Sequence, residues 1–193
     1  MRRATARRSR GVTMLEVLIA IVILTIGLLG VAGMQAQMQN AEVEAYQRAQ
    51  AIVLLQDMVD RINSNRRNAA SYVTATPLGT DSVIDCTAPA TVAARDQCAW
   101  DAALRGAAET AGGVQLGAMN GARGCISNPV ATMPRQVIVA VAWQGTSPTA
   151  APGATACGQG AYGSDHRFRR AMVASVTIGC LQNDPMSGAC VTP

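Results

Sequence analysis

An uncharged apolar segment behind a basic leader constrains this chain more than any other feature. Residues 17–41 contain no ionisable side chain, whereas the ten residues before Gly11 include Arg2, Arg3, Arg7, Arg8 and Arg10. A helix rises about 1.5 Å per residue, so about 20 such residues cross the hydrocarbon core of a membrane. Because the arginines flank only the N-terminal side, we expect that end to stay in the cytoplasm and the remainder to be exported.

The positive charge of the chain belongs to this leader. All 16 basic residues are arginines, and the 11 that follow the leader face 12 acidic residues. A nucleic-acid-binding domain needs a sustained cationic surface, which this body lacks. Nucleic acid is therefore not an expected partner.

Glu16 is the one charge in the apolar stretch from Val12 to Met34, and it bears on how the leader is processed. A secretory signal would be cut after the segment, and Val31-Ala32-Gly33 offers a small-x-small site. Cleavage between Gly11 and Val12 would instead keep the helix and create an α-ammonium on Val12. A carboxylate in a membrane helix costs about 2.5–3.5 kcal/mol, so we expect a partner for it. The ammonium of a neighbouring subunit would serve, which favours cleavage after Gly11.

The run Gly11-Val12-Thr13-Met14-Leu15-Glu16-Val17 resembles the type III signal of type IV prepilins and of the pseudopilins of type II secretion. The resemblance implies that a prepilin peptidase cuts after Gly11 and methylates Val12, where the family usually has Phe. It also implies that Thr13 and Glu16 act in assembly, and that no leader remains in the mature subunit.

Beyond the anchor the sequence predicts that the same helix continues to about Arg66. One face carries apolar residues at three- and four-residue spacing, namely Met38, Ala41, Ala45, Ala49, Ile52, Leu55, Val59 and Ile62. Gly27, Gly30 and Gly33 interrupt the first half. They are either simply tolerated in a membrane helix or permit close helix approach, and spacing alone does not separate these alternatives.

The stretches 26–33, 46–51 and 57–66 are similar to the PilV-type minor pilins, the type IV pilus modification proteins. This implies a low-abundance subunit whose N-terminal helix contacts other major and minor pilins. The implied organisation is a leader over 1–11, a helix over 12–68 and a periplasmic head over 69–193. Within the helix, 12–36 would span the membrane and 37–68 would form an amphipathic stem.

The head is predicted to mix a short helix with strands. The helix is expected over Arg95–Glu109 and a strand over Val114–Met119. The best strand is Arg135–Trp143, in which Val137, Val139, Val141 and Trp143 share a face, and Ala171–Leu181 is the next. The loop between these two strands is expected to be mobile or tied down covalently. The fold class is therefore α+β, a long N-terminal helix packed on a small antiparallel sheet, as pilin kinship also implies.

Six cysteines lie in the head: Cys86, Cys98, Cys125, Cys157, Cys180 and Cys190. An even number confined to the exported part indicates disulfides, and a metal site is disfavoured because there is no C-x-x-C pair and only one His. Six cysteines allow 15 pairings, among which the sequence does not choose. Our hypothesis is sequential pairing, whose last pair, Cys180–Cys190, would resemble the disulfide-closed C-terminal region of many pilins.

Few residues suggest chemistry. His166 lies in a polar loop and is expected to be solvated, and the glycines of Gly158–Gly163 do not form a nucleotide motif. Arg167, Arg169 and Arg170 either meet an acidic partner or DNA, or form a solvated strand edge. We therefore expect no enzyme activity, no catalytic residue, no cofactor and no metal.

The leading hypothesis is a minor pilin that enters the inner membrane by one helix, with its C-terminus in the periplasm, and then joins or primes a surface fibre. Adhesion or twitching motility would follow from that role. A pseudopilin of type II secretion, a pilus-borne adhesin or DNA-binding module, and a lone anchored periplasmic protein are the alternatives.

Overall fold

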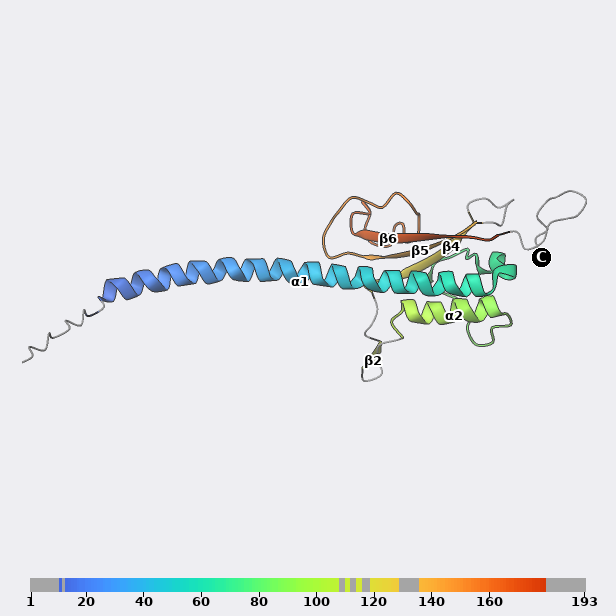
Figure 1. Ribbon diagram of the computed structural model, residues 1–193, viewed down its shortest axis with the longest axis horizontal. Coiled ribbons are helices and arrows are strands. Elements are labelled where there is room, and N and C mark those ends of the chain that lie inside the picture. The colour runs from blue at the N-terminus through green and yellow to red at the C-terminus, as the bar shows by residue number, and fades with distance from the viewer. Residues whose placement is uncertain are drawn as a thin grey trace, which may run out of the picture. The chain divides into compact units, whose positions relative to one another are not determined.

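The computed structural model describes residues 11, 13–107, 110–111, 114–115, 119–128 and 136–179. It divides into two compact units, one ending at Glu42 and one beginning at Val43. The first unit contains the N-terminal half of helix α1, and the second contains the rest of the fold (Figure 1).

Helix α1 runs from Met14 to Ser64, within a few residues of the predicted bounds. No proline occurs in it, and the polar run Asn63-Ser64-Asn65 precedes its replacement by a 3-10 helix, η1 (Arg66–Tyr72). The long predicted helix is confirmed.

The buried face of the stem differs from the predicted one. Its buried residues follow a four- and three-residue spacing: Gln47, Ala51, Leu55, Met58 and Ile62. Of the predicted face, Leu55 and Ile62 are buried, but Met38 and Ile52 are exposed. Ala41, Ala45 and Ala49 of the predicted face are exposed as well. The prediction was wrong for these five residues because the helix is rich in alanine and apolar on more than one side, so periodicity alone did not define a single stripe.

Helix α2 (Val92–Leu104) confirms the predicted short helix with earlier bounds. Thr91 caps its start, since the Thr91 hydroxyl accepts a hydrogen bond from the Ala94 N–H at 3.1 Å. It stops at Gly106, which has a φ of 88°, and the Ala107 N–H then donates to the Ala102 carbonyl at 3.0 Å. This Schellman end explains why the helix stops before the predicted Glu109.

The main sheet is antiparallel, in the order β1-β4-β5-β6. Its strands are β1 (Leu78–Gly79), β4 (Arg123–Ser127), β5 (Gln136–Gln144) and β6 (Arg169–Thr177). Strands β5 and β6 confirm the two best predicted strands, whereas β1 and β4 were not predicted. A separate hairpin joins β2 (Thr110–Ala111) to β3 (Val114–Gln115), so only the first two residues of the predicted 114–119 strand lie in a described strand.

One core joins the stem of α1, helix α2 and one face of the sheet. Met58 and Ile62 of α1, Trp100 and Leu104 of α2, and Val139 of β5 are all buried in it. The Trp100 indole N–H donates to the Leu54 carbonyl of α1 at 2.8 Å, which fastens α2 to the stem. The predicted inward face of β5 is confirmed, since Val137, Val139, Val141 and Trp143 are each at most 3% exposed.

Candidate functional site: the helix start and the head that follows the stem

The start of α1 is built around Thr13. Its carbonyl accepts hydrogen bonds from the Glu16 N–H at 3.1 Å and the Val17 N–H at 3.3 Å, and its hydroxyl accepts from the Glu16 N–H at 3.3 Å. Thr13 is therefore the N-cap of the helix, and Glu16 lies in the first turn. The spacing Thr-x-x-Glu is that of a capping box, a signal that the sequence contains but that our sequence analysis did not use.

Glu16 is exposed on this first turn, and within the described part of the chain its carboxylate forms no ion pair. The helix N-terminus carries a partial positive charge, so the position suits an anion. In a membrane, however, the stabilisation that one helix N-terminus gives an anion is smaller than the cost of burying a carboxylate there. The geometry leaves Glu16 free for a cation supplied from outside the chain.

Gly11 is exposed, and a Cβ built on it would meet no heavy atom within 4 Å. Val12 lies outside the described residues. Among the described residues, no side chain shields the backbone at Gly11, on the N-terminal side of the predicted scissile bond.

The first unit of α1 is apolar on all sides. Between Met14 and Met34 its large apolar side chains are 46% to 91% exposed, and none of its most apolar window is buried. Among the described residues, this is the helix long and apolar enough to cross a membrane. Such a helix requires lipid or other apolar helices around it.

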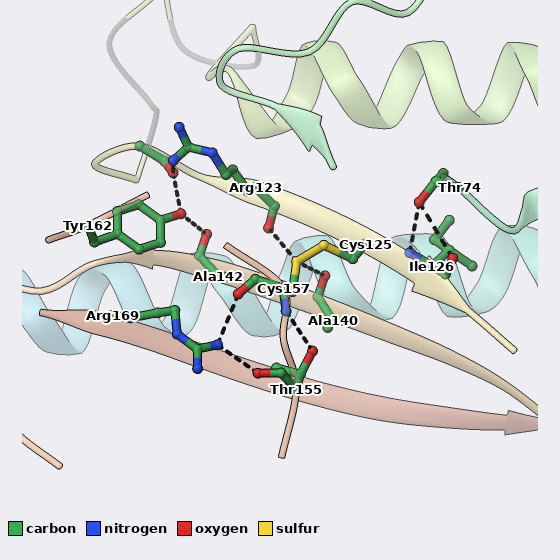
Figure 2. The surroundings of a disulfide bond; sticks show 11 residues. Thr74, Arg123, Cys125, Ile126, Ala140, Ala142, Thr155, Cys157, Tyr162 and Arg169 are labelled. Carbon is green, nitrogen blue, oxygen red and sulfur yellow. Dashed lines mark hydrogen bonds between the residues drawn. A yellow bond between two sulfur atoms is a disulfide. The ribbon is translucent and has the colours of Figure 1, made fainter. Parts of the chain in front are cut away.

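In the head, two disulfides agree with sequential pairing. Cys86 pairs with Cys98 at a Cα–Cα distance of 5.7 Å, and Cys125 pairs with Cys157 at 5.8 Å. Cys180 and Cys190 lie outside the described residues, so their pairing stays a prediction. The Cys125–Cys157 bond ties the long loop between β5 and β6 to the sheet, which confirms that this loop is held covalently (Figure 2).

Tyr162 packs this loop on the sheet face opposite α1, beside Cys157. Its hydroxyl donates to the Gly121 carbonyl at 2.6 Å and lies 3.1 Å from the Ala142 carbonyl (Figure 2). Burial raises the pKa of Tyr162, and the positive charge of Arg123 opposes this only in part. The hydroxyl therefore remains a donor at neutral pH.

Arg169 and Arg170 hold the same loop, and this corrects the expectation of a solvated arginine edge. Arg169 is 4% exposed and donates to the carbonyls of Thr155 at 2.7 Å, Cys157 at 3.0 Å and Pro152 at 2.7 Å. The two terminal nitrogens of the buried guanidinium bond backbone carbonyls from a segment more than ten residues away, whereas its Nε has no hydrogen-bond partner among the described residues. Sequence alone had no signal for this contact.

Arg170 joins the loop to the stem through Glu44. Its guanidinium donates to Glu44 Oε1 at 3.1 Å and to the Ser147 carbonyl at 2.6 Å, and Glu44 Oε1 also accepts from the Thr146 hydroxyl at 2.9 Å. Burial alone would raise the pKa of Glu44, but the Thr146 hydrogen bond and the Arg170 charge outweigh it and lower that pKa. Glu44 therefore holds this loop and the start of β6 on the stem, a role that was not among the sequence-based predictions.

His166 lies where a solvated residue was expected, partly exposed in the loop. Its Nδ1 accepts the Gly160 N–H at 3.3 Å. No group of three or more His, Cys, Asp or Glu side chains suited to a metal occurs among the residues that the structure describes.

An exposed apolar helix that follows an open glycine and an N-cap threonine, with a disulfide-tied α+β head after its stem, defines an architecture of the type IV pilin class. Residues 6–32 match the family "Prokaryotic N-terminal methylation motif", and residues 33–103 match "Type IV pilin Tt1218". The chain is a type IV pilin-like protein with an N-terminal methylation motif.

This motif implies processing by a prepilin peptidase and assembly with other pilins. Pilins are structural proteins, which agrees with the expectation that the chain is not an enzyme. No curated protein and no solved structure gives a significant match to the chain.

Proposed function

We propose that this chain is a PilV-type minor pilin that is cleaved between Gly11 and Val12, methylated on Val12 and incorporated into a type IV pilus or its priming complex. The observation that carries the proposal is the Glu16 carboxylate, exposed and without an ion pair among the described residues, on the first turn of an apolar helix. A charge in that position needs a cation from another subunit.

The proposal assigns a role to each part of the chain. Residues 1–11 are the leader, residues 12–36 hold the subunit in the inner membrane, and residues 37–68 form the stem. The head, residues 69–193, stays in the periplasm until the subunit enters the fibre at the cell surface. Glu16 then pairs with the Val12 amine of an adjacent pilin, while Thr13 keeps the helix start formed.

Substitution of Glu16 tests this pairing. Glu16→Gln keeps the shape of the side chain and removes its charge, so the chain should still insert into the inner membrane but fail to copurify with sheared fibres. Glu42→Gln, an exposed carboxylate on the same helix, is the matched control and should copurify normally. Normal copurification of the Glu16→Gln chain would contradict the proposed role of this carboxylate.

The phenotype of cells that lack this chain distinguishes a minor pilin from a pseudopilin of type II secretion. A minor pilin predicts loss of surface fibres and of twitching motility, with secretion of enzymes intact. Loss of enzyme secretion with normal fibres would instead identify a pseudopilin of type II secretion.

A further inference from the structure

The loop between β5 and β6, drawn in orange in Figure 1, begins with a segment of restricted composition. Residues 145–156 consist only of Gly, Ala, Ser, Thr and Pro, and residues 145–164 include no charged side chain. Segments rich in Ser and Thr with Pro are typical acceptors of O-linked glycans. The segment thus has the composition of a glycan acceptor, and the contacts of each hydroxyl decide which one is available.

Three of the four hydroxyls in this segment hold the loop in place. The hydroxyls of Thr146 and Ser147 donate to Glu44 Oε1, at 2.9 Å and 3.3 Å. The Thr155 hydroxyl accepts the Cys157 N–H at 3.0 Å. A transferase would have to break these contacts before it could use any of the three hydroxyls, so none of them suits modification in the folded head.

The fourth hydroxyl, that of Thr149, is exposed and has no such role. Among the described residues, the hydrogen bond of this hydroxyl goes to the carbonyl of the adjacent Ala150, at 3.4 Å. The Thr149 backbone is nevertheless fixed, because its N–H donates to the Arg167 carbonyl at 2.8 Å. Pro148 and Pro152 lie on either side, and each restricts the residue before it to extended backbone. The fold therefore presents the Thr149 hydroxyl to solvent on an extended, anchored segment.

The residues that follow Thr149 leave room for a bulky group. Ala150, Ala151, Gly153 and Ala154 are all exposed, and none has a side chain longer than a methyl group. A Cβ built on Gly153 would meet no heavy atom within 4 Å. A glycan is bulky and polar, so it needs this space and would give the segment the polar cover that its own side chains do not provide.

We propose that Thr149 is an O-glycosylation site, at which a transferase of the cell attaches a sugar to Thr149 Oγ1. The co-reactant is a sugar whose anomeric carbon carries a pyrophosphate ester. The Thr149 oxygen forms a bond to this carbon as the bond from the carbon to the pyrophosphate breaks. The pyrophosphate ester leaves with the bonding electrons, and the hydroxyl proton passes to a base of the transferase. The site rests on this loop alone and does not depend on the proposed function.

Mass spectrometry of the full chain purified from its own cells tests this site. After reduction, cleavage at arginine releases a peptide of residues 136–167, which contains all four hydroxyls of the segment. This peptide should carry the additional mass of one or more monosaccharides. Electron-transfer fragmentation, which leaves the glycan attached, should place that mass on Thr149.

Substitutions distinguish the Thr149 hydroxyl from the other hydroxyls of the chain. Thr149→Ala should lose the modification completely, whereas Thr149→Ser, which keeps a hydroxyl, should retain it. Thr76→Ala is the matched control and should leave the modified peptide unchanged, because Thr76 is also exposed and beside a proline but lies outside this segment. An unreduced digest of each variant should contain the Cys125–Cys157 disulfide, which shows that the loop has formed.

Several results would overturn the proposal. These are an unmodified 136–167 peptide in the wild-type chain, a phosphate in place of a sugar, a glycan on a different hydroxyl, and persistence of the modification in Thr149→Ala. The N-terminal peptide is measured in the same digest. A chain that begins at Val12 but has an unmodified Thr149 would therefore overturn this site and leave the pilin assignment intact.

Discussion

Gly124 of β4 lies against the indole of Trp100, and this contact makes a quantitative prediction. A Cβ on Gly124 would lie 2.6 Å from Leu104 Cδ1 and still closer to Cη2 and Cζ3 of Trp100. Trp100 is fully buried and holds α2 on the stem of α1. Gly124→Ala should therefore destabilise the head by about 2 kcal/mol through overpacking.

Trp100→Phe removes the clashing ring atoms and the indole N–H. The loss of a buried ring and of its hydrogen bond to Leu54 should cost about 3 kcal/mol. In the double variant the added methyl occupies space that the indole has left. The double variant should therefore lose about 3 kcal/mol, not the additive 5 or so.

Urea unfolding of the oxidised full chain in detergent, followed by far-UV circular dichroism, gives these free energies. Gly153→Ala is the control, because a Cβ there meets no heavy atom within 4 Å. Its effect should be within about 0.5 kcal/mol of zero. Additive losses in the double variant would refute the packing of Trp100 on Gly124.

Three further predictions follow from the head. Glu44→Gln should speed proteinase K cleavage within residues 145–156 about fivefold relative to Glu42→Gln. Because the pKa of Glu44 in the folded chain lies below its ordinary 4.5, the stability that this carboxylate contributes is present above that pH and lost on acidification. Equal cleavage of the two variants would contradict the role of Glu44 in holding this loop. Burial and the Asp96 hydrogen bond raise the pKa of Tyr72 to about 12. The stability that the neutral Tyr72 hydroxyl contributes to the fold is therefore complete below pH 10 and is lost as the pH rises toward 12. Ultraviolet titration of wild type against Tyr72→Phe checks this, and titration of the Tyr72 signal near pH 10 would contradict it. Graded reduction with peptide mapping should open the Cys86–Cys98 disulfide before the Cys125–Cys157 disulfide, because Cys86 is exposed and Cys157 is 5% exposed. Reduction in the reverse order would contradict the burial of Cys157.

The elements that sequence predicted well have strong periodic signals. Val137, Val139, Val141 and Trp143 recur at every second position in a run rich in β-branched residues, so strand β5 and its inward face were predictable. Ala140 and Ala142 are also buried, under the loop that carries Tyr162, and small residues give no indication of such a cover. Strand β4 has one large apolar residue, Ile126, which is too weak a signal for a strand.

The contacts of Arg169 and Arg170 were not predictable from the sequence. A charged residue at a strand start is usually solvated, yet Arg169 is buried because three carbonyls from a distant loop surround it. Glu44 lies on the stem of α1, and its partners lie about a hundred residues later in the chain. Long-range hydrogen bonds of this kind depend on the tertiary fold and leave no local pattern.

At the start of helix α1, the sequence contains more signals than our predictions drew on. Gly11 and Glu16 were identified from the cost of a charge in an apolar helix, and residues 6–32 match the methylation motif. The capping role of Thr13 was readable from its three-residue spacing to Glu16.

The mature N-terminus tests the central claim most directly. Mass spectrometry of the chain isolated from fibres of its own cells should find a polypeptide that begins at Val12 and carries one additional methyl group on its amine. A chain that begins near Met34, without the apolar helix, or one that retains residues 1–11 in the fibre, would contradict the account.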